Sequence, residues 1–184
     1  MSVAEQTAVT VWQLDPAHTQ VEFSAKHMMF TTVKGHFGKI SGTIRLDEQD
    51  ISRSSVEAEI DAASLDTRVE QRDTHLRSQD FLHVEQHPVI TFKSTQVERV
   101  GDDRLNVTGD LTIRGTTRTV VLDATLTGRG KSPFGTTVAG FEAHTTINRK
   151  DFGLNWNVAL EAGGVLVSDK VAINLELAFI APAA

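Results

Sequence analysis

The chain has 184 residues, of which 40% are hydrophobic and 23% charged, so it is a folded protein long enough to bury a sizeable core. Its formal net charge of -6, with no block of Lys or Arg, argues against nucleic acid and against an anionic membrane surface as partners. The absence of cysteine excludes disulfides, thiolate nucleophiles and Cys-ligated metals. No Gly/Ser-rich or Pro-rich tract divides the chain, and we therefore expect one domain over residues 1–184.

The N-terminal residues 1–12 have neither a basic start nor an apolar run, so no signal peptide is visible there. No apolar run elsewhere approaches the ~20 residues that a membrane-spanning helix needs. We expect a cytoplasmic protein without a transmembrane segment.

The first half of the chain reads as a series of short strands. An apolar segment at residues 9–14 ends at Asp15-Pro16, and a segment with clean alternation follows. One face of this second strand carries Val21, Phe23, Ala25, His27 and Met29. His27 is thus in phase with the apolar set. The alternation changes parity near Gly38, which predicts a β-bulge or a glycine kink before further strands at residues 40–46 and 56–62.

The second half continues the same pattern after Pro88, with almost no spacer between strands. Apolar residues alternate with polar ones over 105–113 and 120–126, and the turn at 114–116 between them predicts a hairpin. Further strands follow at 139–147 and 167–179. Arg149 keeps the inward parity of the strand before it.

Residues 68–92 contain the one stretch with helical spacing. Val69, Leu76 and Phe81 share a face while charged residues occupy the rest, which predicts a short amphipathic helix. The helix should end by His87, because Pro88 disfavours helical geometry in the residue before it. A single helix among strands is expected to cover an apolar opening.

Together these patterns predict an all-β protein, an antiparallel β-barrel of about eight strands with a short helix near one mouth. Strict alternation and short links indicate an antiparallel meander with one dry face, and a sheet of this size usually closes. Many inward residues are small, which favours a cavity over a filled core. A two-sheet sandwich with small residues at close contacts is the alternative.

Six blocks of the sequence resemble the YceI-like, polyisoprenoid-binding family: DPAHTQVEFSAKHM, VKGHFGKISGTI, RDTHLRSQDFL, HPVITFKS, LTIRGTTRTVVL and NRKDFGL. They occur in the family's order and cover nearly all of residues 10–180. The resemblance implies a lipocalin-like barrel whose apolar interior accommodates an isoprenoid chain, and therefore a lipid- or quinone-binding protein and not an enzyme. Many members carry a secretory signal and act in the periplasm, and this chain departs from them there.

Candidate ligand-binding residues are those with inward parity or a place on the helical segment. They are Phe23, His27, Phe37, Arg72, Leu76, Phe81, Phe92, Leu111, Leu122, Ala124, Phe141, Ala143 and Arg149. Arg72 or Arg149 could meet the polar head of a ligand, since a guanidinium suits phosphate or carboxylate. The alternative for Arg72 is a structural pair with Asp73 that fixes the helix to the rim. His27 is either a hydrogen-bonded core imidazole or a polar handle for the ligand.

The histidines at 75, 83 and 87 raise the question of a metal site. Glu85 lies between His83 and His87, whereas the HExxH zinc motif needs Glu directly after the first His. Asp73, His75 and Ser78 resemble a hydrolytic triad only in composition, because no GxSxG motif accompanies them. We expect no catalytic residue, no metal and no cofactor other than a bound isoprenoid lipid or quinone as ligand.

The leading hypothesis is a carrier, storage or sequestering protein for a polyprenyl phosphate or an isoprenoid quinone. Each buried methylene contributes roughly 0.8 kcal/mol, so a long chain needs few polar contacts. One alternative is an enzyme acting on a small apolar substrate in the same cavity, with histidines as acid-base groups. Another is a stress-related structural or interaction domain with a filled core. The expected partner is an apolar small molecule, and a homodimer is left open.

Overall fold

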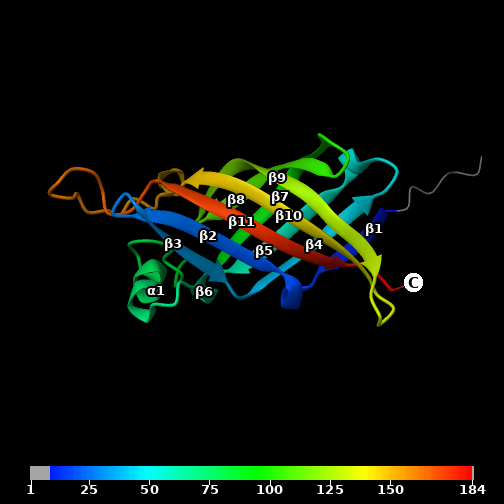
Figure 1. Ribbon diagram of the computed structural model, residues 1–184, viewed down its shortest axis with the longest axis horizontal. Helices are drawn as coiled ribbons and strands as arrows, with labels where there is room; N and C mark the ends of the chain where they lie inside the picture. Colours follow the sequence, from blue (N-terminus) through cyan, green and yellow to red (C-terminus); the bar gives the residue numbers. More distant parts are fainter. Residues whose placement is uncertain (1–8, 184) are drawn as a thin grey trace, which may run out of the picture.

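The computed structural model describes residues 9–183 (Figure 1). The strands are β1 (Val9–Leu14), β2 (Gln20–His27), β3 (Thr31–Phe37), β4 (Ile40–Asp47), β5 (Ser55–Asp61), β6 (Leu65–Asp66), β7 (Val89–Arg99), β8 (Arg104–Ile113), β9 (Thr116–Lys131), β10 (Thr137–Asn148) and β11 (Lys170–Ile180). The α-helix α1 spans Glu70–Arg77, and the short 3₁₀ helices are η1 (Pro16–His18), η2 (Ile51–Arg53), η3 (Ala62–Ser64) and η4 (Arg149–Phe152).

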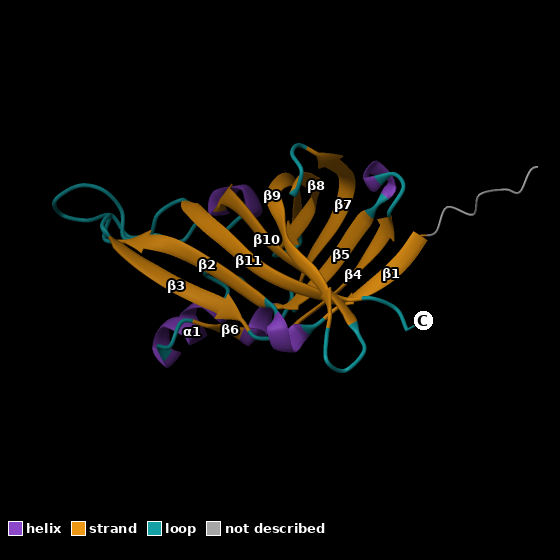
Figure 2. Cartoon of the chain, turned by 45° about the vertical axis from the view of Figure 1, so that its right-hand side comes forward, coloured by secondary structure: helices purple, strands orange, loops and turns teal. Residues whose placement is uncertain are grey.

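Eight of these strands form a closed antiparallel barrel in the order β1-β4-β5-β7-β8-β9-β10-β11 (Figure 2). The ring closes where β1 pairs with β11, through Gln13 with Ile180 and Leu14 with Phe179. The predicted barrel with a short helix is confirmed. The sandwich alternative is wrong, because the strands of residues 9–183 form a single sheet that closes on itself.

Strands β2, β3 and β6 extend the sheet beyond the closed ring at the end where α1 lies (Figure 1). Strand β2 pairs with β11 only over residues 20–24, and the rest of it pairs with β3. The chain bends at Gly38 between β3 and β4, where the change of parity predicted a kink. The chain therefore passes from the extension, in β3, directly into the barrel wall, in β4.

The helix is shorter than the apolar spacing indicated. It ends at Arg77, because the Ser78 hydroxyl donates to the carbonyl of His75 (2.6 Å) and the chain then turns, with His83 at a positive φ of 49°. Phe81 therefore lies in the turns after the helix and not on it, and Val69 is exposed at the N-cap. Within residues 9–183, no helix has the length and hydrophobicity needed to cross a bilayer.

Candidate ligand-binding cavity

The interior of the barrel holds a cavity of about 320 Å³ whose wall is apolar. Side chains from all eight barrel strands line it, and every lining residue is buried or partly buried. Small-molecule sites occupy about 300 to 1,000 Å³, so this cavity is at the small end of that range. The inward face is therefore not a filled core, which is what the many small inward residues predicted.

Eleven of the thirteen candidate residues line this cavity. They are Phe23, Phe37, Leu76, Phe81, Phe92, Leu111, Leu122, Ala124, Phe141, Ala143 and Arg149. His27 and Arg72 are not among the lining residues. Period-two alternation thus located the wall of the cavity correctly where the strands pair regularly.

Space in the barrel comes from small residues at paired positions. Ala143 on β10 is paired with Ala124 on β9, and their exposed fractions are 2% and 6%. A β-carbon added at Gly109 would clash with the ring of Phe92, and one added at Gly35 would clash with the ring of Phe23. Both phenyl rings therefore lie over a glycine of the neighbouring strand, along the wall. This arrangement leaves the centre of the barrel free.

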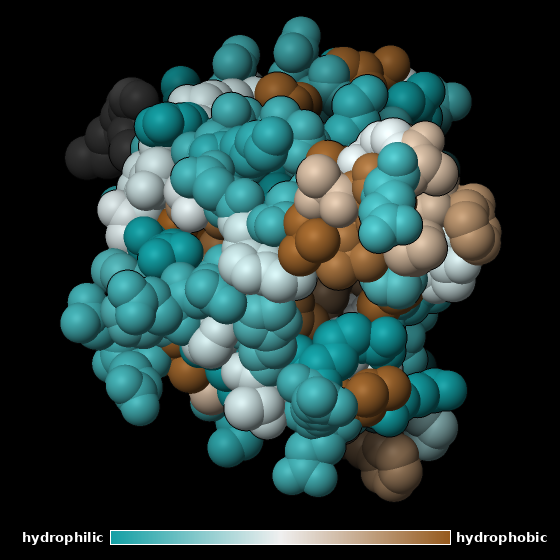
Figure 3. All heavy atoms as spheres, turned by 90° about the vertical axis from the view of Figure 1, so that its left-hand side faces the viewer, coloured by the Kyte–Doolittle hydropathy of each residue, from teal (hydrophilic) through white to brown (hydrophobic). Residues whose placement is uncertain are grey.

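His27 lies outside the cavity, because it is the last residue of β2, beyond residues 20–24 that pair with β11 of the ring. Its side chain is exposed, and its backbone forms a bridge with Val167 in the loop before β11. The neighbouring Met28, Met29 and Phe30 are exposed in the turn to β3. Figure 3 shows this end of the molecule, with apolar side chains gathered beside a hollow in its surface. His27 has the same parity as the lining residues Phe23 and Ala25, but it lies past the end of the cavity.

Arg72 and Asp73 fix the helix, as the structural alternative predicted, but they do so through Thr67 and not as an ion pair. The carboxylate of Asp73 accepts hydrogen bonds from the backbone N–H (2.9 Å) and the hydroxyl of Thr67. Arg72 donates from Nε to the Thr67 hydroxyl (2.7 Å) and from Nη2 to the Thr67 carbonyl (2.7 Å). Asp73 and Thr67 are both buried. Two nitrogens of the Arg72 guanidinium thus bind Thr67, away from the cavity.

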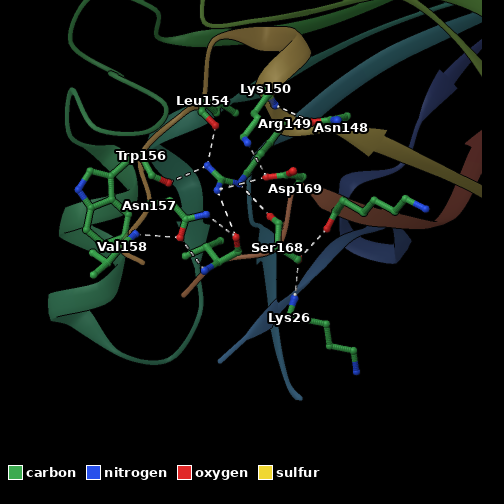
Figure 4. Close-up of polar contacts among 12 residues, drawn as sticks. Lys26, Asn148, Arg149, Lys150, Leu154, Trp156, Asn157, Val158, Ser168 and Asp169 are labelled. Carbon is green, nitrogen blue, oxygen red and sulfur yellow. Dashed lines mark hydrogen bonds and ion pairs between the residues drawn. The ribbon is translucent and has the colours of Figure 1, made fainter. Parts of the chain in front are cut away.

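Arg149 lines the cavity, but its guanidinium donates hydrogen bonds to backbone carbonyls (Figure 4). Nε donates to Ser168 (2.8 Å), Nη1 to Leu154 (2.6 Å) and Trp156 (2.9 Å), and Nη2 to Val167 (3.3 Å). The side chain is 3% exposed. Burial lowers the pKa of Arg149, and the neighbouring Asp169 carboxylate opposes that shift. This arginine ties the 153–169 loop to the end of β10.

An aromatic cluster joins the helical segment to the same loop. The ring centroids of His75 and Trp156 are 4.6 Å apart, those of His75 and Phe81 5.0 Å, and those of Phe81 and Trp156 5.5 Å. Nε2 of His75 is 2.9 Å from Oδ2 of Asp80. His75 therefore packs against Phe81 and Trp156 and holds the helix end to the loop.

Neither the metal site nor the triad is assembled. His83 and His87 have their rings 5.9 Å apart, and residues 9–183 contain no group of three His, Cys, Asp or Glu side chains suited to a metal ion. Asp73 accepts a hydrogen bond from Thr67, and His75 is hydrogen-bonded to Asp80. The Ser78 hydroxyl donates to a backbone carbonyl. These three side chains form no relay.

A second hollow, of about 210 Å³, was not predicted from the sequence. It abuts the cavity at the end of the barrel opposite α1, because the two share Ile44, Leu46, Ile51, Leu105, Phe141 and Phe179. Arg129 of β9 lines it, although the alternation of 120, 122, 124 and 126 placed odd-numbered residues outside. The signal that could have revealed the change is the pair of glycines at 128 and 130, typical of an irregular strand.

The protein-family comparison matches residues 12–179 to the YceI-like domain. Among curated relatives, a UPF0312 protein of Pectobacterium atrosepticum is 44% identical over 137 residues, 74% of this chain and 71% of the relative. A UPF0312 protein of Pseudomonas aeruginosa is 40% identical over 141 residues, 77% of this chain and 73% of the relative.

Solved structures with the same fold support this assignment. BcnA of Burkholderia cenocepacia has a TM-score of 0.77 at 26% identity, over 90% of this chain and 98% of that one. A YceI protein of Campylobacter jejuni has a TM-score of 0.73 at 29% identity, over 86% and 90%. A domain of Saccharophagus degradans described as polyisoprenoid-binding has a TM-score of 0.67 at 17% identity, over 95% and 100%. A family match over most of the chain, relatives well above 30% identity and a shared barrel agree: the chain belongs to the YceI-like family.

Proposed function

We propose that the barrel binds a long apolar isoprenoid ligand, a polyprenyl phosphate or an isoprenoid quinone, and acts as a carrier, storage or sequestering protein for it. The observation that carries this proposal is the apolar wall of the cavity of about 320 Å³. Transfer of an apolar chain from water into this space is favourable by roughly 0.8 kcal/mol per methylene. The chain itself carries no polar group that would be buried without a hydrogen bond. Recognition of the tail is then loose with respect to chemical detail.

The lining residues favour binding over catalysis. Among the residues that line the cavity, the titratable ones are Glu22 and Arg149. Glu22 is partly exposed and lies 4.0 Å from Lys34, while the donors of Arg149 are engaged with backbone carbonyls. An acid-base enzyme needs a titratable group within reach of its substrate, and no histidine of the described chain lines this cavity.

The relatives add a weaker line of support. The Saccharophagus degradans domain is described as polyisoprenoid-binding, and its likeness to this chain is one of fold. Since one fold hosts many functions, the chemistry of the cavity has to carry the proposal. The apolar wall is consistent with the ligand class that the neighbour's description names.

Native mass spectrometry of protein isolated from its own host, followed by organic extraction, tests this proposal. We expect one apolar molecule per chain with the mass and fragmentation of a prenylated compound. A matched preparation of Ala143→Phe, in which the cavity is partly filled, should lack it. Recovery of a polar metabolite, or of no ligand together with no binding of added prenyl compounds, would reject the proposal.

A further inference from the structure

The hollow opposite α1 has charged side chains in its wall, whereas the main cavity is apolar. It shares six lining residues with the main cavity, so the two spaces adjoin. Its remaining wall includes five charged side chains, all exposed: Glu48, Arg99, Asp102, Asp103 and Arg129. A ligand whose tail fills the main cavity can therefore place a polar head here, in contact with solvent.

A β-bulge aims Arg129 into this hollow. Along β9 and β10, Leu126 pairs with Phe141 and Gly128 pairs with Gly140, so Thr127 is the extra residue. The parity of β9 changes there, and Arg129 pairs with the buried Ala139 on the inward face. Bulges occur where a strand must redirect a side chain, and this one redirects a guanidinium.

Arg129 then reaches across the end of the barrel. Its Nη2 lies 2.7 Å from Oε1 of Glu48, which follows β4, and its Cζ lies 5.0 Å from the centroid of the Trp12 ring on β1. Three strands separate β4 from β9 in either direction around the barrel, so the ion pair spans the opening. The two side chains are 47% and 51% exposed, and such pairs are weak and exchangeable.

The charges at this end decide what kind of head fits. Arg99 and Arg129 contribute two positive charges, whereas Glu48, Asp102 and Asp103 contribute three negative ones. An anionic phosphate would meet a net negative surround, which costs free energy. A guanidinium has five N–H donors, and the contact with Glu48 cancels its charge while leaving donors for a neutral acceptor.

We propose that Arg129, paired with Glu48, is the head-group site of the barrel and that it takes an uncharged head with carbonyl acceptors, the quinone class, in preference to a phosphate. This inference rests on the proposed function, because the tail must occupy the main cavity for the head to arrive here. The guanidinium lies over the buried Trp12 ring, which holds it at the wall of the hollow.

The test compares three probes that share a farnesyl tail: a benzoquinone, a monophosphate and the hydrocarbon without a head group. In the parent protein we expect the quinone to bind more tightly than the phosphate. Arg129→Gln should weaken quinone binding about tenfold while changing hydrocarbon binding less than about twofold. Glu48→Gln exposes the charge of Arg129 and should strengthen phosphate binding about tenfold.

The matched control is Arg104→Gln, which removes the same charge from an exposed pair with Asp123 (3.3 Å) that lines neither space. It should leave all three affinities unchanged. The quinone should also quench Trp12 in Trp156→Phe protein, because the other tryptophan lies in the helix-end cluster. This readout places the head without changing Arg129.

Tighter binding of the phosphate than of the quinone, equal loss of all probes in Arg129→Gln, or no quenching of Trp12 by bound quinone would each overturn the head-group proposal. Hydrocarbon binding separates that result from failure of the proposed function. If the hydrocarbon binds and Arg129→Gln changes the affinities of all three probes equally, only the head-group proposal is wrong. If no probe binds, the ligand-binding proposal itself falls.

Discussion

The two ends of the barrel use arginine in opposite ways. At the α1 end, Arg149 is buried and its donors are engaged with four backbone carbonyls. At the other end, Arg129 is half exposed and meets one carboxylate across the opening. A buried guanidinium with fixed acceptors is a structural tie, whereas an exposed one in a weak pair keeps donors that a ligand can use. Location within the barrel, and not residue type, decides the role.

The largest effect that this comparison predicts is on stability. Arg149→Leu should lower the free energy of unfolding by about 3–5 kcal/mol, because it leaves buried carbonyls without donors. Arg129→Leu, the matched change at the other end, should cost no more than about 1 kcal/mol. Urea unfolding monitored by circular dichroism measures both. Similar losses of unfolding free energy in the two variants would show that the two arginines do not differ in their structural role.

Filling the main cavity should abolish ligand binding whatever residues stand at the two ends of the barrel. Ala143→Phe places a ring opposite Ala124 in the space of about 320 Å³, and we expect affinity for a prenyl hydrocarbon to fall at least about a hundredfold. Because the ring enters free space, the fold should be retained. In a filled core the same change would overpack and cost about 1–3 kcal/mol. Lost stability with unchanged binding would contradict the cavity.

A charge at the α1 end should speed ligand release. Leu76 lines the cavity, so Leu76→Asp sets a carboxylate against the apolar tail and should raise the off-rate about tenfold while the strands remain intact. Leu76 is a sharper position than Phe81, which is a buried core residue whose change would disrupt the segment. His83→Ala, outside the lining, should leave the off-rate unchanged within about twofold. Stopped-flow displacement with excess competing ligand measures these rates.

The smallest effect concerns the loop after β4, at the Arg129 end. Hydrogen bonds from the Ser52 hydroxyl and backbone N–H lower the pKa of Asp50 below its ordinary value of 3.8. A lowered folded-state pKa stabilises the fold above the ordinary value, and this contribution is lost as pH falls through the folded-state pKa. Asp50→Asn should therefore be slightly less stable than the parent at neutral pH and equal to it in strong acid. A difference that grows toward acid pH would contradict this sign.

The sequence predicted the barrel wall well because alternation is a direct consequence of strand geometry. Phe92, Leu111, Leu122 and Ala124 face the cavity since they lie in regularly paired parts of the closed ring. Alternation does not show where a strand runs past the end of the cavity, and for that reason it assigned the exposed His27, at the end of β2, to the interior.

The ends of the barrel were harder to predict because they depend on local irregularities. One extra residue at Thr127 reverses the side that Arg129 faces, and a single-sequence pattern does not count bulges. The length of α1 depends on the Ser78 hydroxyl bond, which shortens the predicted helical segment. The cytoplasmic location and the identity of the ligand stay predictions.

The most direct test of the ligand cavity is a crystal structure of the complex with a brominated prenyl hydrocarbon, located by the anomalous signal of bromine. We predict the bromine inside the barrel, against the pair of Ala124 and Ala143 and the ring of Phe92. Bromine found only on the outer surface, with Phe92 or Phe141 turned inward to fill the space, would contradict the binding role of this barrel.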